Sequence, residues 1–149
     1  MKKLTKKAED MTLKELAAYI DYSVLKPEFT PEQIIELTKD GVKLGCATIC
    51  INPGYMDLCE PYVKGSETKL CPVTDFPFGT SSTASKVQQI EMVAKYDTVG
   101  EVDVVANFGK IRAGLYDEVT ADIKACADAA HKYGRELKVI FETDALNEE

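Results

Sequence analysis

Short runs of β-branched and apolar residues alternate with helical patterns along the whole sequence, and this alternation constrains the fold more than any other feature. Each junction between a run and a helical pattern carries glycine, proline or a helix-capping residue. Repeated βα units of this kind build a parallel sheet covered by helices. The sequence therefore predicts an α/β fold. The expected strands are residues 22–25, 47–52, 69–76, 101–107 and 136–142.

Helices are expected between these strands, and capping residues mark where several of them begin or end. Thr12 and Glu15 have the spacing of a capping box at the start of a lead-in helix. Pro31 fits the first position of the next helix, and Gly134 fits the residue after the longest one. The expected helices are residues 11–20, 31–44, 54–63, 82–95 and 117–133. No internal linker interrupts the pattern, so residues 1–149 are expected to form a single domain.

The charge balance and the apolar runs exclude several classes of partner. A formal net charge of −7 opposes binding to a polyanion, so nucleic acid is not an expected partner. No apolar run approaches the roughly 18 residues that span a membrane, and the lysine-rich start is not followed by the apolar stretch of a signal peptide. We therefore expect a cytoplasmic protein without membrane contact.

The cysteines and the single histidine argue against a metal site and against a histidine-based catalytic triad. Five cysteines are an odd set, and thiols in apolar segments pack as small hydrophobes in the reduced form. Their spacing does not match a structural zinc site. His131 lies at the polar end of a helix, which predicts a solvated surface position. We expect no metal and no cofactor.

Ionisable residues inside two successive strands break the rule that buried parallel strands are apolar. Glu101 and Asp103 alternate with valines, which places both on one face of their strand. Lys138 and Glu142 do the same on the next strand in sequence. If the two strands are neighbours, Asp103 lies beside Lys138. Such a pair is either a structural ion pair or an acid and amine site, and the pattern alone leaves both readings open.

Other polar residues lie near the ends of the expected strands, where parallel α/β folds place their chemistry. Asp21 is the most informative of them, although an aspartate before a strand is also a routine turn or capping residue. The others are Cys50, Asn52, Thr74 and Asp75. Residues 79–83 could hold an anion with backbone N–H groups, and helix capping by Ser81 or Ser82 explains that segment equally well.

Six segments together carry a resemblance to a known family. In order and spacing, the sequence resembles the deoxyribose-phosphate aldolases at residues 21–27, 47–53, 75–79, 101–105, 107–109 and 137–143. The resemblance implies a TIM (β/α)8 barrel and a class I aldolase that reversibly cleaves 2-deoxy-D-ribose 5-phosphate to D-glyceraldehyde 3-phosphate and acetaldehyde. It implies a lysine Schiff base and neither a metal nor an organic cofactor.

The resemblance also assigns roles to individual residues. Asp103 matches the proton-relay aspartate of the family, and Lys138 matches a lysine beside the reaction centre. Asp21 matches a second acid of the relay, and Cys50 matches a thiol that lines the substrate pocket. Asn52, from its place at the end of the same strand, is a further candidate for substrate binding. The Schiff-base lysine of the family lies on the sixth strand and its phosphate-binding loops follow the last strands, beyond the segments matched here.

Five strands would form a truncated barrel arc rather than a closed barrel. An open arc leaves unpaired strand edges, so we expect a homo-oligomer, a complementing C-terminal half that supplies strands six to eight, or poor solubility. The chain would then be a gene fragment, part of a split enzyme or a decayed copy. Its function is either that of an aldolase acting on a sugar phosphate, with Lys138 as a possible substitute nucleophile, or that of a non-catalytic half-barrel. A doubly wound sheet is a further, less favoured fold.

Overall fold

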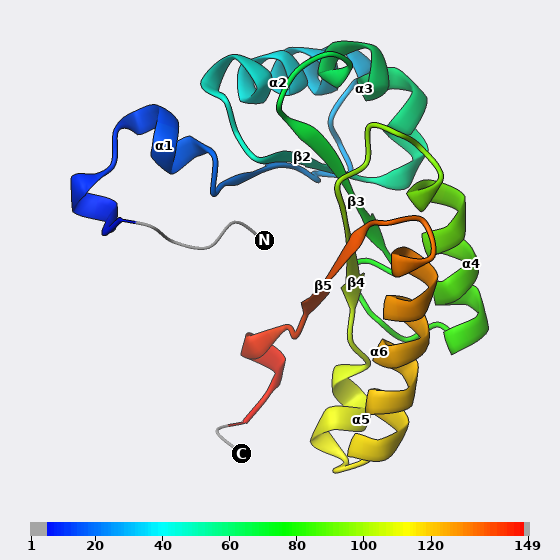
Figure 1. Ribbon diagram of the computed structural model, residues 1–149. Coiled ribbons are helices and arrows are strands. Elements are labelled where there is room, and N and C mark those ends of the chain that lie inside the picture. Colours follow the sequence, from blue (N-terminus) through cyan, green and yellow to red (C-terminus); the bar gives the residue numbers. More distant parts are fainter. Residues whose placement is uncertain (1–5, 148–149) are drawn as a thin grey trace. The chain divides into compact units, whose positions relative to one another are not determined.

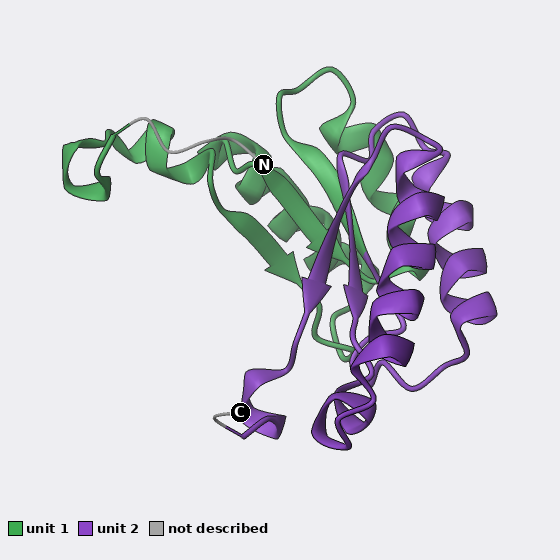
Figure 2. Cartoon of the chain, turned by 60° about the horizontal axis from the view of Figure 1, so that its bottom comes forward, with its two compact units in different colours: residues 1–72 green, residues 73–149 purple. Residues whose placement is uncertain are grey.

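The computed structural model describes residues 6–147, and Figure 1 shows the order of the elements. Figure 2 colours two compact units, residues 1–72 and residues 73–149, which are described one at a time below. The five strands are parallel and hydrogen-bonded in their order along the chain. They are β1 (Asp21–Val24), β2 (Thr48–Ile51), β3 (Lys69–Thr74), β4 (Glu101–Val105) and β5 (Glu136–Ile140).

The first unit contains β1, β2 and the four residues of β3 that pair with β2. Thr12 and Thr30 each form a capping box, at the starts of α1 and α2 respectively. Gly45 ends α2 in the left-handed conformation, at φ 77°, which glycine adopts without steric cost. The helical elements of this unit are η1 (Ala8–Asp10), α1 (Leu13–Ala17), α2 (Pro31–Leu44), η2 (Pro53–Tyr55) and α3 (Met56–Val63).

One face of β1 and β2 packs closely against α2. A Cβ placed on Gly41 of α2 would lie 2.4 Å from Ile49 Cδ1 and 3.1 Å from Tyr22 Cγ, so the helix approaches the strands where it has no side chain. Successive residues of a strand face opposite sides. Because Tyr22 and Ile49 face α2, their sequence neighbours Asp21 and Cys50 face away from that helix.

The second unit contains β4, β5 and the last two residues of β3, which pair with β4. α4 packs against α6, and these two helices lie along β4 and β5 on one side of the sheet (Figure 1). The alternate residues Val102 and Val104 of β4 are fully buried, as expected for the side of the strand under the helices. The helical elements are α4 (Thr83–Ala94), α5 (Phe108–Arg112), α6 (Tyr116–His131) and η3 (Thr143–Ala145).

The structure shortens four of the expected strands, of which β2 loses one residue at each end. β3 ends at Thr74 and β5 at Ile140, because Asp75 and Glu142 take the left-handed conformation, with φ values of 50° and 56°. β4 ends at Val105 rather than at residue 107. The sequence analysis also missed α5, a five-residue helix that follows β4. Its first turn is capped by the side chain of Asn107, which accepts a hydrogen bond from the backbone N–H of Lys110.

The strand order separates the two fold classes that were considered. A doubly wound sheet reverses its strand order at a switch point, such as 2-1-3-4-5, whereas here each strand pairs with the next one in sequence. This is the order of a TIM-barrel arc, which confirms the predicted fold class and contradicts the doubly wound alternative. Among residues 6–147, β1 pairs only with β2 and β5 only with β4, so the sheet is not closed. The expectation of a single domain stays a prediction.

A search of the described helices for one that is both long enough and apolar enough to cross a membrane found none.

Candidate active site

The acid and the amine predicted on neighbouring strands meet in the second unit. Asp103 and Lys138 are register partners of the parallel β4 and β5, so their side chains leave the sheet on the same face. Lys138 Nζ lies 2.9 Å from Asp103 Oδ1 and donates a 2.6 Å hydrogen bond to Glu101 Oε2. The predicted contact of Asp103 with Lys138 is confirmed.

The cluster of Glu101, Asp103 and Lys138 is largely buried, so its charged groups must compensate one another. Asp103 is only 8% exposed, and the Lys138 side chain is 22% exposed. Asp103 Oδ1 is buried and contacts the ammonium group at ion-pair distance, without the angles of a hydrogen bond. A carboxylate in such a place is costly unless a cation lies beside it. The site therefore holds one cation between two acids on the side of the sheet away from α4 and α6.

The amine of this cluster is engaged rather than available. Attack on a carbonyl carbon requires a neutral amine with a free lone pair, whereas Lys138 Nζ directs its N–H groups and its charge at Glu101 and Asp103. The arrangement is suited to orient a carboxylate and to relay a proton. Glu142, which was expected to share this face of the strand, does not belong to it, because β5 ends at Ile140 and Glu142 has left-handed backbone.

The predicted residues of the first unit lie on one face of β1 and β2. Asp21 of β1 is the register partner of Thr48 of β2, and Thr48 Oγ1 donates a 2.6 Å hydrogen bond to Asp21 Oδ1. Cys50 follows Thr48 by two positions and shares its face. Asp21 is half-buried and Cys50 is buried. A hydroxyl, a thiol and a carboxylate therefore line this side of the first two strands.

Asn52 has a structural contact that the sequence did not reveal. Its Nδ2 donates a 3.1 Å hydrogen bond to the backbone carbonyl of Leu25, which follows β1. This bond ties the ends of β1 and β2 together. The role of Asn52 in binding a substrate stays a prediction.

Comparison with known proteins finds similarity to one family over part of the length of its members. No family model matches the chain. Deoxyribose-phosphate aldolase from Clostridium kluyveri is 40% identical over 141 residues, which cover 93% of this chain and 63% of that relative. The protein of the same name from Desulfitobacterium hafniense is 39% identical over 139 residues, with the same two coverages. By sequence, this chain is a partial, N-terminal match to the deoxyribose-phosphate aldolase family.

Solved structures of deoxyribose-phosphate aldolases show the same fold. A crystal structure from Coccidioides immitis, provisionally described as such an aldolase, matches with a TM-score of 0.84 and 31% identity over 92% of this chain and 53% of that chain. The aldolase of Aeropyrum pernix, described as a unique tetramer, matches with a TM-score of 0.75 and 26% identity over 91% of this chain and 56% of that chain. The chain thus spans under two thirds of the aldolases it matches.

The second unit also contains a buried lysine that the sequence analysis overlooked. Lys86 of α4 is 0% exposed, and its Nζ donates hydrogen bonds to Asp122 Oδ2 of α6 at 2.8 Å and to the Val105 carbonyl of β4 at 3.0 Å. The signal was its spacing, because Lys86 precedes the buried Ile90 by four positions and so lies on the same helical face.

The segment that could have held an anion holds a carboxylate of this chain. Asp75, which follows β3, accepts hydrogen bonds from the backbone N–H and the Oγ of Ser81, at 3.0 and 2.6 Å. Ser82 Oγ accepts from the backbone N–H of Ser85, which confirms capping of α4 by Ser82. Gly79 lies between Asp75 and Ser81 in the sequence, with a φ of 66°, and a Cβ added to it would be 2.3 Å from the Ala106 carbonyl oxygen.

The described cysteines are reduced, as expected, and His131 is exposed at the end of α6. Burial, with a smaller contribution from Asp122, raises the pKa of the Cys126 thiol to about 11. Burial also raises the pKa of Cys46 and of Cys59. These three thiols therefore stay protonated at neutral pH, where a thiol is a poor nucleophile.

Proposed function

We propose that this chain supplies the N-terminal part of a deoxyribose-phosphate aldolase. The proposed reaction is the reversible cleavage of 2-deoxy-D-ribose 5-phosphate to D-glyceraldehyde 3-phosphate and acetaldehyde. The observation that carries the proposal is the 2.9 Å contact of Asp103 with Lys138 on the side of β4 and β5 that the helices leave uncovered. The similarity to aldolases over 93% of the chain supports the same conclusion.

In this proposal, Asp103 transfers a proton, and Lys138 keeps the carboxylate of Asp103 in position. Cleavage through a Schiff base requires a group that removes the proton of the hydroxyl at the breaking C–C bond and returns a proton to the carbon of the resulting enamine. Asp103 is a carboxylate with one buried oxygen against an ammonium group, which orients it. Asp21 is the proposed second acid, and Cys50 and Asn52 are the proposed contacts to the substrate.

The Schiff-base nucleophile is proposed to come from outside residues 1–149. Lys138 is held by two acids, and Lys86 is buried against Asp122 and a backbone carbonyl. Neither amine presents a free lone pair to a carbonyl substrate. We therefore propose that a complementing C-terminal half supplies the nucleophile and strands six to eight.

The uncovered edge of β5 is where we propose that the complementing strands add. All residues of β5 except the exposed Glu136 are only half-buried, and Phe141 directly after the strand is 53% exposed. An apolar edge strand of this kind is a template for pairing with another chain. We also propose that the chain forms a homo-oligomer, because the Aeropyrum pernix aldolase is described as a tetramer. A cytoplasmic location is a separate part of the proposal.

One observation favours a second candidate, a non-catalytic half-barrel. The engagement of both Lys86 and Lys138 by acids leaves the isolated chain without either of them as a nucleophile. In that case the chain would bind a sugar phosphate weakly, or would have no ligand, when no second half is present.

Complementation separates the two candidates. The chain is co-expressed with the C-terminal segment of the Clostridium kluyveri relative that lies beyond the matched residues, and release of glyceraldehyde 3-phosphate is followed in a coupled assay. We expect cleavage with both halves and none with this chain alone. Asp103→Asn should lower the rate by about 10²- to 10⁴-fold, the usual contribution of an acid–base group. Asp128→Asn, which removes an exposed carboxylate of α6, is the matched control.

Trapping with borohydride identifies the amine that reacts. Condensation of an amine with acetaldehyde releases water and forms an imine, and borohydride delivers hydride to the C=N bond to fix the product on the lysine. We expect the trapped lysine on the complementing segment. An adduct on Lys138 would instead assign it as a substitute nucleophile. Absence of both cleavage and adduct in a folded, co-purified complex would leave the non-catalytic half-barrel.

A further inference from the structure

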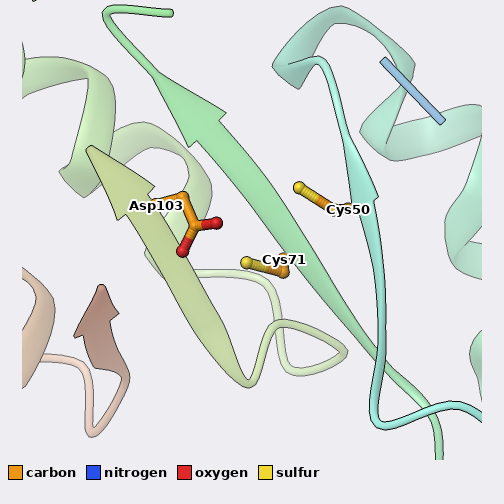
Figure 3. A group of neighbouring side chains, drawn as sticks. All are labelled: Cys50, Cys71 and Asp103. Atoms are coloured by element: carbon orange, nitrogen blue, oxygen red, sulfur yellow. The ribbon is translucent and has the colours of Figure 1, made fainter. Parts of the chain in front are cut away.

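Two thiols of the first unit lie opposite each other on neighbouring strands. Cys50 of β2 and Cys71 of β3 are register partners in a parallel pair, so both side chains leave the sheet on the same face. Their sulfur atoms lie within 4.8 Å of each other. Figure 3 shows both side chains on their strands, together with Asp103 on β4. Two sulfur ligands are therefore presented side by side by the backbone of a sheet.

The surroundings of this pair keep water away from it. Cys50 is 4% exposed and Cys71 is 0% exposed, and neither is part of a disulfide. Both lie on strands that are held by parallel hydrogen-bond ladders, so their separation is set by the sheet. A pair of soft ligands fixed in a dry place is suited to a soft cation and poorly suited to a hard, hydrated one.

We propose that Cys50 and Cys71 form a two-sulfur binding site for a soft monovalent cation of the Cu(I) class. Structural zinc takes four ligands in a tetrahedron, which two thiols do not supply, whereas Cu(I) accepts two sulfur atoms in line. A linear S–Cu–S unit separates its sulfur atoms by two metal–sulfur bonds, and two sulfur atoms that lie within 4.8 Å of each other are close enough to bind one such cation together.

Binding exchanges protons for metal and needs no oxidant. Each thiol releases its proton to water, and each sulfur forms one bond to the cation. Copper enters and remains as Cu(I), so no electron is transferred. The inference rests on the strand pairing of Cys50 with Cys71 and not on the aldolase reaction, although Cys50 is also a proposed contact to the substrate. It also differs from the sequence expectation of no metal, which considered zinc spacings along the chain and not thiols brought together by strand pairing.

The site is tested by anaerobic competition for Cu(I). The whole chain, kept reduced, is titrated into the coloured Cu(I) complex of bicinchoninate, and loss of colour measures transfer of copper to the protein. We expect one tight equivalent. Cys50→Ala and Cys71→Ala should each lose it. Cys59→Ala is the matched control, because Cys59 is equally buried in the same unit but lies on α3, where it accepts a hydrogen bond from Thr38.

A second measurement uses the unaltered protein, so that misfolding of a variant does not decide the question. X-ray absorption at the copper edge should show two sulfur ligands and no nitrogen or oxygen ligand. A different ligand set would overturn the proposal. So would retention of the tight equivalent by a folded Cys50→Ala or Cys71→Ala chain, or its loss from a folded Cys59→Ala chain. A Cys50–Cys71 disulfide found by mass spectrometry, in place of bound copper, would also refute it.

Discussion

The two units differ in how their strands carry polar groups on the side away from the helices. In the second unit the groups are ionised and cross-paired, with Lys138 between Glu101 and Asp103. In the first unit Asp21 is the only acidic residue among the polar residues that were singled out, and it accepts a hydrogen bond from the hydroxyl of Thr48. Charges on a strand need opposite charges on the next strand, whereas hydroxyls and thiols do not. The paired charges therefore lie in the second unit, whereas the first unit carries Asp21 together with uncharged polar groups.

The largest expected loss of stability comes from breaking the buried ion pair of the second unit. Lys86→Met leaves Asp122 buried without its cation, and loss of one partner of a buried pair costs about 3–5 kcal/mol. Urea unfolding measures the change. Lys124→Met, which removes an exposed partner of Asp128 on the same helix, should cost no more than about 0.5 kcal/mol. Equal costs for the two variants would show that the buried pair has no special weight.

The next effect concerns the segment after β3. Gly79→Ala places a Cβ 2.3 Å from the Ala106 carbonyl oxygen at φ 66°, so it adds a backbone clash to the cost of about 1–2 kcal/mol for left-handed alanine. Gly114→Ala has the same kind of φ, 71°, but meets nothing within 4 Å. Unfolding free energies of the two variants should differ by the clash alone. The comparison fails if Gly114→Ala is as destabilising as Gly79→Ala.

A smaller effect compares one strand contact from each unit. Lys138→Met leaves Glu101 and Asp103 as neighbouring carboxylates with no cation, which should cost about 1–3 kcal/mol. Thr48→Val in the first unit removes one hydrogen bond to Asp21 and should cost about 1 kcal/mol. Denaturant midpoints give both values. A larger loss for Thr48→Val would reverse the contrast drawn between the ionic and the neutral strands.

The smallest effect is a pH dependence. The pKa of Cys126 is raised to about 11 from 9.0, so between these values the unfolded chain releases a proton that the folded chain retains. Stability should therefore fall as pH rises from 9 to 11. The urea midpoint of the unaltered chain should drop more over this range than that of Cys126→Ala. An identical drop in the two proteins would remove burial of this thiol as a cause.

Local periodicity predicted the strand order and the contact of Asp103 with Lys138. Alternation of period two fixes the face of each residue, and successive βα units make successive strands neighbours. It could not locate the ends of β3 and β5, because these depend on left-handed backbone at Asp75 and Glu142. It also could not reveal the bond of Asn52 to the Leu25 carbonyl, since that contact joins residues 27 positions apart.

Lys86 shows a different limit of sequence reasoning. A lysine is assigned to solvent by default, and the burial of Lys86 depends on the carboxylates of Asp122, 36 residues away, and of Asp75, 11 residues away. The four-residue spacing from Ile90 indicates that Lys86 lies on the buried face of its helix, but no neighbouring residue in the sequence identifies Asp122 as its ion-pair partner. Pairs of this kind are recognised only when two helices are seen together.

The enclosure of Lys86 has a consequence for the order in which the second unit assembles. Docking of α4 before α6 would bury the Lys86 ammonium group with only the Asp75 carboxylate, at 3.8 Å, as an ion-pair partner, and docking of α6 first would bury Asp122 without its cation. An intermediate with only one of these helices docked is therefore disfavoured. We therefore expect α4 and α6 to dock onto the sheet in the same step, so that the second unit folds in an all-or-none manner.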